Sequence, residues 1–316
     1  MATTSKSKKV KAIEHTNGHE QTQKRLEVLK TYKIYIGGKF PRTESGRYYT
    51  PKNKNGELLA NVCRSTRKDF RNSVVAARGA VGSWAGKSAF NRSQILYRIA
   101  EMMEGRKVQF VEELMQQDSS KAKAIAEVEC SIDRLIYYAG WADKYQQIYS
   151  SVNPVASSHF NFSVPEPTGV IAVIASEETS LIGLVSMVAP IISGGNTCVI
   201  LASENKPLCA VTFSEVLHSS DVPGGVVNIL TGLQEEVYEH FATHMDVNAV
   251  IYCGSNEKMI KEIKEKSANN MKRAIIHKNV DWMSAEVQSP YHIMDTQEIK
   301  TTWHPIENIS PKGGGY

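Results

Sequence analysis

The sequence predicts an α/β fold with a doubly wound parallel, Rossmann-like sheet that follows a helical N-terminal segment. Two observations favour this class. Between residues 169 and 267, short runs of β-branched and aliphatic residues alternate with helical stretches, as in strands that are buried on both faces. Before residue 150, by contrast, the apolar residues recur with helical spacing over long stretches. A parallel sheet preceded by helices accounts for both patterns.

The N-terminal segment is predicted to contain one hairpin and three helices. Residues 34–40 alternate and turn on a Gly pair, which indicates a β-hairpin. Thr66 is a suitable cap for the first helix, and Gly79 is the expected stop signal after Arg78. Two longer helices are expected at 89–117 and 121–148, from their apolar residues at helical spacing.

The sheet unit is predicted to alternate four strands with four helices. The strands are expected at 169–175, 197–201, 226–230 and 249–253. The helices are expected at 181–193, 207–219, 235–243 and 256–267. An exposed strand at 159–164 precedes this unit, and another at 297–303 follows it. Because an unpaired strand edge favours aggregation, we expect these two to pair, within this chain or with a neighbouring one.

Charge and cysteine usage exclude several classes of function. The net charge of +4 is mild, and much of it comes from Lys6, Lys8, Lys9, Lys11, Lys24 and Arg25. Past that tail the charge is nearly balanced, so no nucleic-acid or membrane partner is expected for the folded body. The five cysteines are Cys63, Cys130, Cys198, Cys209 and Cys253. They show no CxxC spacing and no paired His pattern, which predicts reduced thiols and no metal site.

No stretch of 18 uninterrupted apolar residues is present, and the N-terminus has no apolar core of a signal peptide. We therefore expect no transmembrane helix and a cytoplasmic location.

Several short stretches, in this order and spacing, resemble the aldehyde dehydrogenase family. They are Tyr35-Ile36-Gly37-Gly38-Lys39, Pro167-Thr168-Gly169-Val170-Ile171, Gly194-Gly195-Asn196-Thr197, the run from Pro223 to Gly232, Val250 to Ser255, and Gln297 to Trp303. The resemblance covers about 32–280 and then 293–303. It implies NAD or NADP as the cofactor, and it implies that the strand at 297–303 serves oligomerisation.

On this resemblance the chain divides into seven parts. They are a disordered basic tail at 1–30, a hairpin and helices at 31–150, an oligomerisation strand at 151–168, a Rossmann-like cofactor domain at 169–280, a short linker at 281–292, a C-terminal oligomerisation strand at 293–305, and a flexible tail at 306–316. The linker stands where the family has its thiol-bearing catalytic domain, and it contains no cysteine. Without that nucleophile no thiohemiacetal forms, so the catalytic domain is expected to be absent.

The chain departs from the family at reactive positions. Glu178 stands in the place of the Asn that donates to the oxyanion, and His277 stands in the place of the Glu that acts as general base. An ionised carboxylate cannot donate a hydrogen bond. Leu201 replaces a Lys that binds the adenosine ribose, and Met259 replaces a Gly of the phosphate turn, where its bulk would block the pyrophosphate. Cofactor binding is therefore expected to be weak or lost.

The positions retained from the family's cofactor site are Glu204, Gly225, Gly254 and Ser255. The pattern resembles the degenerate second half of two-part, family 16-like members. It predicts a non-catalytic or regulatory subunit that assembles with itself or with a full-length aldehyde dehydrogenase. Three alternatives stay open: a dinucleotide sensor, an oxidoreductase that uses Cys253 or an active site completed by a partner chain, and a structural component of a larger assembly with the basic N-terminal tail as its anchor. The plainer interpretation of Cys253 is a small buried residue, and that of His277 is a satisfied core or surface group.

Overall fold

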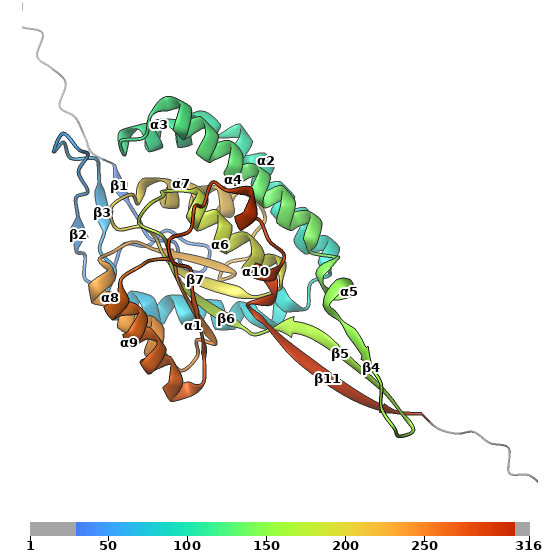
Figure 1. Cartoon of the computed structure of the whole chain (residues 1–316). Coiled ribbons are helices and arrows are strands. Elements are labelled where there is room, and N and C mark those ends of the chain that lie inside the picture. Colours follow the sequence, from blue (N-terminus) through green and yellow to red (C-terminus); the bar gives the residue numbers. More distant parts are fainter. Residues whose placement is uncertain (1–29, 307–316) are drawn as a thin grey trace, which may run out of the picture.

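The structure, a computed structural model, describes residues 30–306. The tails predicted at 1–30 and 306–316 lie outside these residues except for Lys30 and Ile306. At the centre is a five-stranded parallel sheet in the order β10-β9-β6-β7-β8 (Figure 1). Its strands are β6 (Val170–Ile174), β7 (Thr197–Leu201), β8 (Val227–Leu230), β9 (Ala249–Tyr252) and β10 (Arg273–Ile276). The predicted α/β class with a parallel sheet is confirmed, and β10 is a strand that the sequence did not predict.

The central strands form because each is a short run, mostly of aliphatic and β-branched residues, whose side chains pack in two cores. All five residues of β6 are buried. Ile171 and Val173 pack in one hydrophobic cluster, whereas Val170, Ala172 and Ile174 pack in another. Successive side chains of a strand point to opposite faces, so the two clusters are the two faces of the sheet. Each face therefore needs its own cover of helices.

Helices cover both faces (Figure 1). The cluster on one face joins the sheet to α6 (Ile182–Ser193), α7 (Leu208–His218), α2 (Ala89–Gly105), α3 (Lys107–Gln116) and α4 (Lys121–Trp141). The cluster on the other face joins it to α1 (Arg67–Ala85), α8 (Gln234–Thr243) and α9 (Glu257–Ser267), after which a 3-10 turn spans Ala268–Asn270. No helix within residues 30–306 is long and apolar enough to cross a membrane.

The predicted helix ends before residue 150 need correction. The start of α1 is as predicted, and the Asp69 carboxylate accepts from the Thr66 backbone N–H at 2.8 Å. Gly79 is not its stop signal, because α1 continues to Ala85 while packing on β7 and β8. The cost of an interior Gly, about 1 kcal/mol, is smaller than the gain from that packing. The two longer helices are each interrupted, at Arg106 and at 142–144, and a short α5 (Tyr145–Tyr149) follows.

Three short strands lie beside the N-terminal part of the body. They are β1 (Thr31–Tyr32), β2 (Tyr48–Tyr49) and β3 (Asn61–Cys63), in the order β1-β3-β2. The hairpin predicted at 34–40 is reduced to a tight turn, in which Ile36 and Lys39 exchange two backbone hydrogen bonds of 3.0 Å. Gly37 and Gly38 occupy the left-handed region, with φ of +59° and +79°, which explains the Gly pair.

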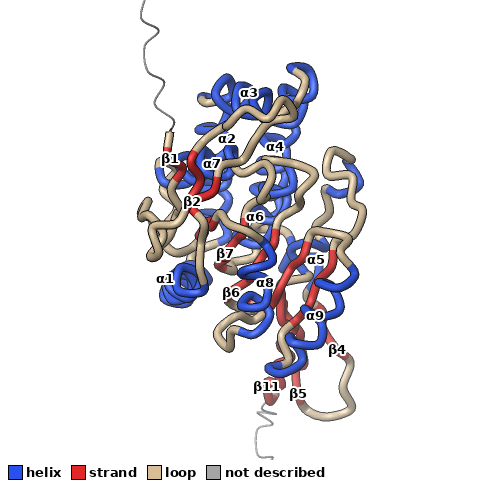
Figure 2. The backbone as a smooth tube through the Cα atoms, turned by 90° about the vertical axis from the view of Figure 1, so that its left-hand side faces the viewer, coloured by secondary structure: helices blue, strands red, loops and turns tan. Residues whose placement is uncertain are grey.

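A second three-stranded sheet projects from the body as an arm (Figures 1 and 2). Its strands are β4 (Ser151–Asn153), β5 (His159–Pro167) and β11 (Gln297–Pro305), in the order β11-β5-β4. The register of β5 and β11 is antiparallel, from Gln297 opposite Pro167 to Pro305 opposite His159. The predicted pairing of these strands is therefore confirmed, and it occurs within one chain.

The segment predicted as a linker, 281–292, packs on the body. It contains a 3-10 turn (Ala285–Val287) and leads into α10 (Tyr291–Met294). Trp282 is 3% exposed and Ile293 is fully buried, and both belong to the core cluster that contains α4 and α6. The segment is thus part of the fold, because its apolar side chains fill space over α6.

Candidate functional site

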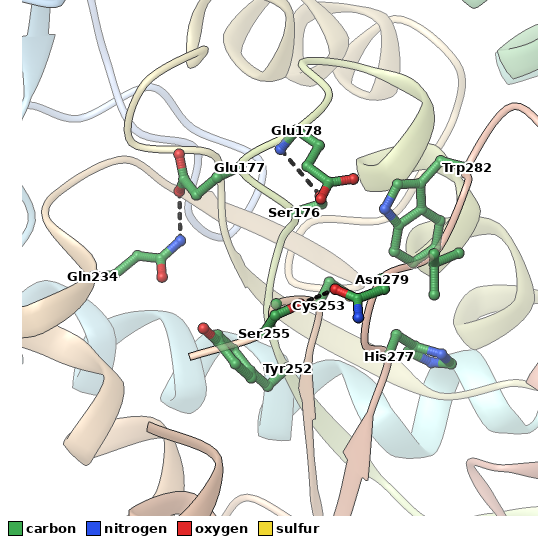
Figure 3. Close-up of a pocket in the computed structure, with 12 residues that line it drawn as sticks. Ser176, Glu177, Glu178, Gln234, Tyr252, Cys253, Ser255, His277, Asn279 and Trp282 are labelled. Carbon is green, nitrogen blue, oxygen red and sulfur yellow. Dashed lines mark hydrogen bonds between the residues drawn. The ribbon is translucent and has the colours of Figure 1, made fainter. Parts of the chain in front are cut away.

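A cavity of about 180 Å³ opens at the carboxyl ends of β6, β9 and β10 (Figure 3). In open α/β sheets this edge is where ligands bind. Four of the six predicted site residues line the cavity: Glu178, Gly254, Ser255 and His277. The remaining two, Glu204 and Gly225, are not among its lining residues. Ligand pockets usually measure about 300–1,000 Å³, so this cavity is too small to enclose a whole dinucleotide.

Glu178 and Glu177 follow β6 but have opposite environments. Glu178 is exposed, and within the described chain its carboxylate makes no hydrogen bond. The Glu177 carboxylate is fully engaged. Its donors are Ser203 Oγ (2.8 Å), Glu204 N (2.8 Å), Asn205 N (3.0 Å), Asn205 Nδ2 (2.9 Å) and Gln234 Nε2. Glu177 therefore ties the turn after β6 to the neighbouring loop and to α8, a role that the sequence did not signal.

His277 directly follows β10, and its backbone N–H donates to the Tyr252 carbonyl oxygen at 2.9 Å. Its ring lies edge-on to Trp282, with 6.0 Å between the ring centroids, and 5.1 Å from the ring of His292. Burial, aided by the neighbouring His292, lowers the pKa of His277 to about 4. The imidazole is thus neutral at physiological pH.

The turn after β9 is closed by the chain's own side chains. A side chain at Gly254 would place its Cβ 2.5 Å from the Tyr252 hydroxyl, so only Gly fits there. The Ser255 hydroxyl donates to Asn279 Oδ1 at 2.6 Å (Figure 3). Ser255 is exposed, whereas Tyr252 is only 4% exposed.

Met259 does not obstruct the cavity as the sequence suggested. Its side chain is 6% exposed and packs in the cluster that contains Ile260 and Ile263. What occupies the start of α9 is Asn256, whose Oδ1 accepts from the backbone N–H groups of Lys258 and Met259 at 3.1 and 3.2 Å. Glu257 adds an acidic group in the first turn.

The same arrangement occurs in all four helices that follow β6 to β9. At the start of each, a side chain accepts a hydrogen bond from a free backbone N–H. The accepting residues are Glu127 for α6 (2.9 Å), Gln117 for α7 (3.1 Å), Glu204 for α8 (3.0 Å) and Asn256 for α9 (3.2 Å). Helix N-termini bind phosphate through these N–H groups. Here at least one backbone N–H group at the start of each of these helices is already paired with a side chain of the chain itself.

The structure gives the other retained positions packing roles. The Glu204 carboxylate accepts from the backbone N–H of Gln234, at the start of α8. Gly225 comes just before β8 and so lies at the amino ends of the strands, away from the cavity. A Cβ at this position would lie 2.5 Å from the Ala76 carbonyl oxygen of α1. Leu201 is fully buried in the core cluster that contains α1 and α8. The structure therefore does not bring Glu204 or Gly225 to the cavity.

Cys253 lines the cavity wall but is a core residue. It is 4% exposed, and burial raises the pKa of its thiol well above the usual range. The thiol is thus protonated at neutral pH, in line with the plainer interpretation of a small buried residue. All five cysteines are unpaired, and four of them are buried.

Comparison with known proteins identifies the family. The model of the aldehyde dehydrogenase family matches residues 40–278. Retinal dehydrogenase 2 of Gallus gallus is 33% identical over 259 residues, and the mitochondrial benzaldehyde dehydrogenase of Antirrhinum majus is 32% identical over 243 residues. These matches cover 79% and 74% of this chain, but 49% and 45% of the relatives.

A solved structure of an aldehyde dehydrogenase from Bacillus cereus, in complex with NAD+, has the same fold. It superposes with a TM-score of 0.75 at 24% identity, over 79% of this chain and 51% of that chain. The chain thus spans about half the length of the relatives it matches. The family-model match covers most of the described residues, and on that evidence the chain belongs to the aldehyde dehydrogenase family.

Proposed function

We propose that this protein is a non-catalytic member of the family, which acts as an accessory or regulatory subunit in a homo- or hetero-oligomer. The observation that carries this proposal is the filled ligand edge, where side chains of the chain itself occupy the N-termini of α6, α7, α8 and α9. The resemblance to the degenerate half of two-part members agrees with it. The five unpaired cysteines support a cytoplasmic location.

The filled edge disfavours a dinucleotide because its pyrophosphate would compete with groups already in place. Glu127 and Glu204 also bring carboxylates to this edge, and Glu257 adds a third beside α9. These negatively charged carboxylates repel the negatively charged phosphates of NAD or NADP. The residues present therefore fit a dinucleotide poorly, and binding is expected to be weak or lost.

The cavity also lacks the groups that the family's thiol chemistry needs, namely a reactive thiolate and a donor to the oxyanion. A thiol attacks as the thiolate, and the buried Cys253 holds its proton. Glu178 stands where an oxyanion donor would be needed, and an ionised carboxylate only accepts hydrogen bonds. His277 is neutral and turned toward Trp282 and His292.

The arm supports an assembly role. It exposes Val152, Phe160, Ile299 and Trp303 by 68%, 45%, 54% and 58%, on strands that project from the body. Exposed apolar groups gathered on one element mark an interaction surface. The strand register places Val152 and Phe160 on one face of the arm and Ile299 and Trp303 on the other. We infer that the arm binds, through these two faces, the corresponding arm of a second copy or of a full-length aldehyde dehydrogenase.

Native mass spectrometry of the protein, purified gently from its own cells, tests the assembly. The expected species is a homo-oligomer or a complex with a full-length aldehyde dehydrogenase. Phe162→Ala and Trp303→Ala should each weaken association at least about tenfold, a loss of 1.4 kcal/mol. Tyr97→Ala, on the exposed face of α2, is the matched control and should change nothing. A wild-type monomer without a dehydrogenase partner contradicts the proposal.

The competing function is a dinucleotide sensor, favoured by the exposed Ser255 beside Gly254 in the cavity. Calorimetry with NAD+ and NADP+ distinguishes it. We expect no binding at millimolar ligand, and we expect Asn256→Gly to strengthen binding because it frees the N–H groups of α9. Micromolar binding by the wild type would establish the sensor instead. Aldehyde oxidation by the isolated chain that is lost in Cys253→Ala would establish an enzyme.

A further inference from the structure

Three side chains that offer metal-binding atoms meet behind the candidate site. His277 follows β10, His292 lies in α10, and Asp295 follows α10. One atom from each of the three lies within 4.8 Å of the other two. His292 Nδ1 and Asp295 Oδ2 are 3.5 Å apart, and the two imidazole rings have centroids 5.1 Å apart. All three side chains are half-buried.

Two features distinguish this group from a chance cluster. First, His292 Nδ1 is buried and has no hydrogen-bond partner, which is unfavourable unless something fills the position. Second, the group borders a cavity of about 10 Å³, whose other walls are Met187, Pro190, Ile191 and Ile251. About 10–15 Å³ is the room that a single water needs. The cavity is therefore of atomic size, polar on one side and apolar on the other.

We propose that His277, His292 and Asp295 bind one divalent first-row transition ion, with Zn²⁺ as the best fit. Two imidazoles and one carboxylate are ligands that Zn²⁺ prefers, with a water in the fourth position. Bonds of about 2.0–2.1 Å in a tetrahedron place ligand atoms about 3.4 Å apart. The His292–Asp295 pair already has this spacing. The remaining pairs must approach by up to about 1.4 Å, which rotation of the rings supplies.

The ion would be a structural link rather than a catalyst. His277 sits at the edge strand of the main sheet, whereas His292 and Asp295 sit just before β11. Metal binding at these three groups closes the loop 277–295 and so fixes the root of the arm against the sheet. His277 borders both the candidate cavity and this smaller one, so the ion would also fix the orientation of its ring.

The test uses the full chain, stripped with a chelator and then titrated with ZnCl2 and, separately, CoCl2. Calorimetry should show one equivalent of Zn²⁺. Bound Co²⁺ should show the intense visible absorption of a four-coordinate ion without thiolate bands in the near-ultraviolet. Because a ligand that binds only the native state stabilises it, Zn²⁺ should raise the unfolding temperature.

Two variants and a control assign the site. His292→Asn and Asp295→Asn should each weaken Zn²⁺ binding at least about 100-fold, because even outer-shell substitutions cost 10–100-fold. His244→Asn replaces a half-buried histidine beside Phe70 and should bind as the wild type does. Should His292→Asn fail to fold, Asp295→Asn at the exposed side of the group still decides. The proposal would be overturned by the absence of stoichiometric Zn²⁺ binding, by thiolate bands in the Co²⁺ spectrum, or by variants that bind Zn²⁺ as tightly as the wild type does.

Discussion

The Arg134 guanidinium, buried within α4, donates to the backbone carbonyl oxygen of Trp282 at 3.2 Å, across 148 residues of sequence. It also donates to the Ser284 carbonyl oxygen at 3.3 Å and to Ser186 Oγ at 2.8 Å. One side chain thus satisfies the backbone of the segment that precedes α10 and joins it to α4 and α6.

Removing this side chain should destabilise the fold. We expect Arg134→Ala to lower the free energy of unfolding by about 2–4 kcal/mol, because buried carbonyl groups lose their donors. Urea denaturation followed by tryptophan fluorescence measures the loss. Arg98→Ala, on the exposed face of α2, is the control and should change it by less than about 0.5 kcal/mol. Equal effects would show that the Arg134 contacts contribute little.

Glu177 and Glu178 are adjacent acidic residues with different surroundings, so their alanine variants can be compared directly. The Glu177 carboxylate accepts five hydrogen bonds. We therefore expect Glu177→Ala to lower the free energy of unfolding by about 2–3 kcal/mol. Glu178→Ala, one residue further, should be nearly neutral because its exposed carboxylate has no partner within residues 30–306. Thermal unfolding of the two variants separates them, and a reversed order would refute the assignment.

Glu113 should make stability depend on pH. Burial raises the pKa of its carboxyl from 4.5 to about 7, although Thr212 and Tyr32 donate to it at 2.6 and 3.0 Å. The folded state thus holds a proton that the unfolded state has released between pH 4.5 and 7. The free energy of unfolding should therefore fall across that window as pH rises, by at most about 3 kcal/mol. Urea titrations from pH 4.5 to 8 measure this, and Glu113→Gln should flatten the decline. A decline that persists in the variant would assign it to other groups.

Thiol labelling should find one accessible cysteine. Cys130, in α4, is half-buried, whereas Cys63, Cys198, Cys209 and Cys253 are buried. Burial also raises the pKa of the Cys198, Cys209 and Cys253 thiols, which reduces the reactive thiolate. A chromogenic disulfide reagent should modify one thiol per native chain and five after unfolding. Loss of the native signal in Cys130→Ser assigns it, and rapid labelling of Cys253 would contradict the burial described above.

The sequence predicted the central sheet well because its strands are buried on both faces. Such strands are short, nearly continuous apolar runs, as Val170–Ile174 shows, and their length and β-branched residues favour strands over helices. The strand β10 was not predicted because Arg273–Ile276 lacks the pattern of a buried strand. It is short, begins with a charged residue and is half-buried, since it is the outermost strand of the sheet. The continuation of α1 past Gly79 depends on packing against β7 and β8, which the local sequence does not contain.

Four of the six predicted site residues line the candidate cavity, whereas Glu204 and Gly225 do not. Glu178, Gly254, Ser255 and His277 follow strands, and the carboxyl ends of parallel strands share one edge. Glu127, Gln117 and Asn256, which cap helices at that edge, were not among the predicted site residues. Glu127 and Gln117 come from a part of the chain more than 50 residues before the helices they cap, as 181 minus 127 shows. Such long-range caps carry no local signal.

The pairing of β5 with β11 has a consequence for how the chain folds. Gln297 lies opposite Pro167, so β5 meets its partner only after 130 further residues have been made, as 297 minus 167 shows. Contacts between distant residues form slowly because the intervening loop must first close. While the protein leaves the ribosome, the central sheet can assemble with the edge of β5 still open. The order of synthesis thus makes the pairing of β11 with β5 the last strand pairing of the described chain to form, and it leaves that edge of β5 open to wrong pairing until then.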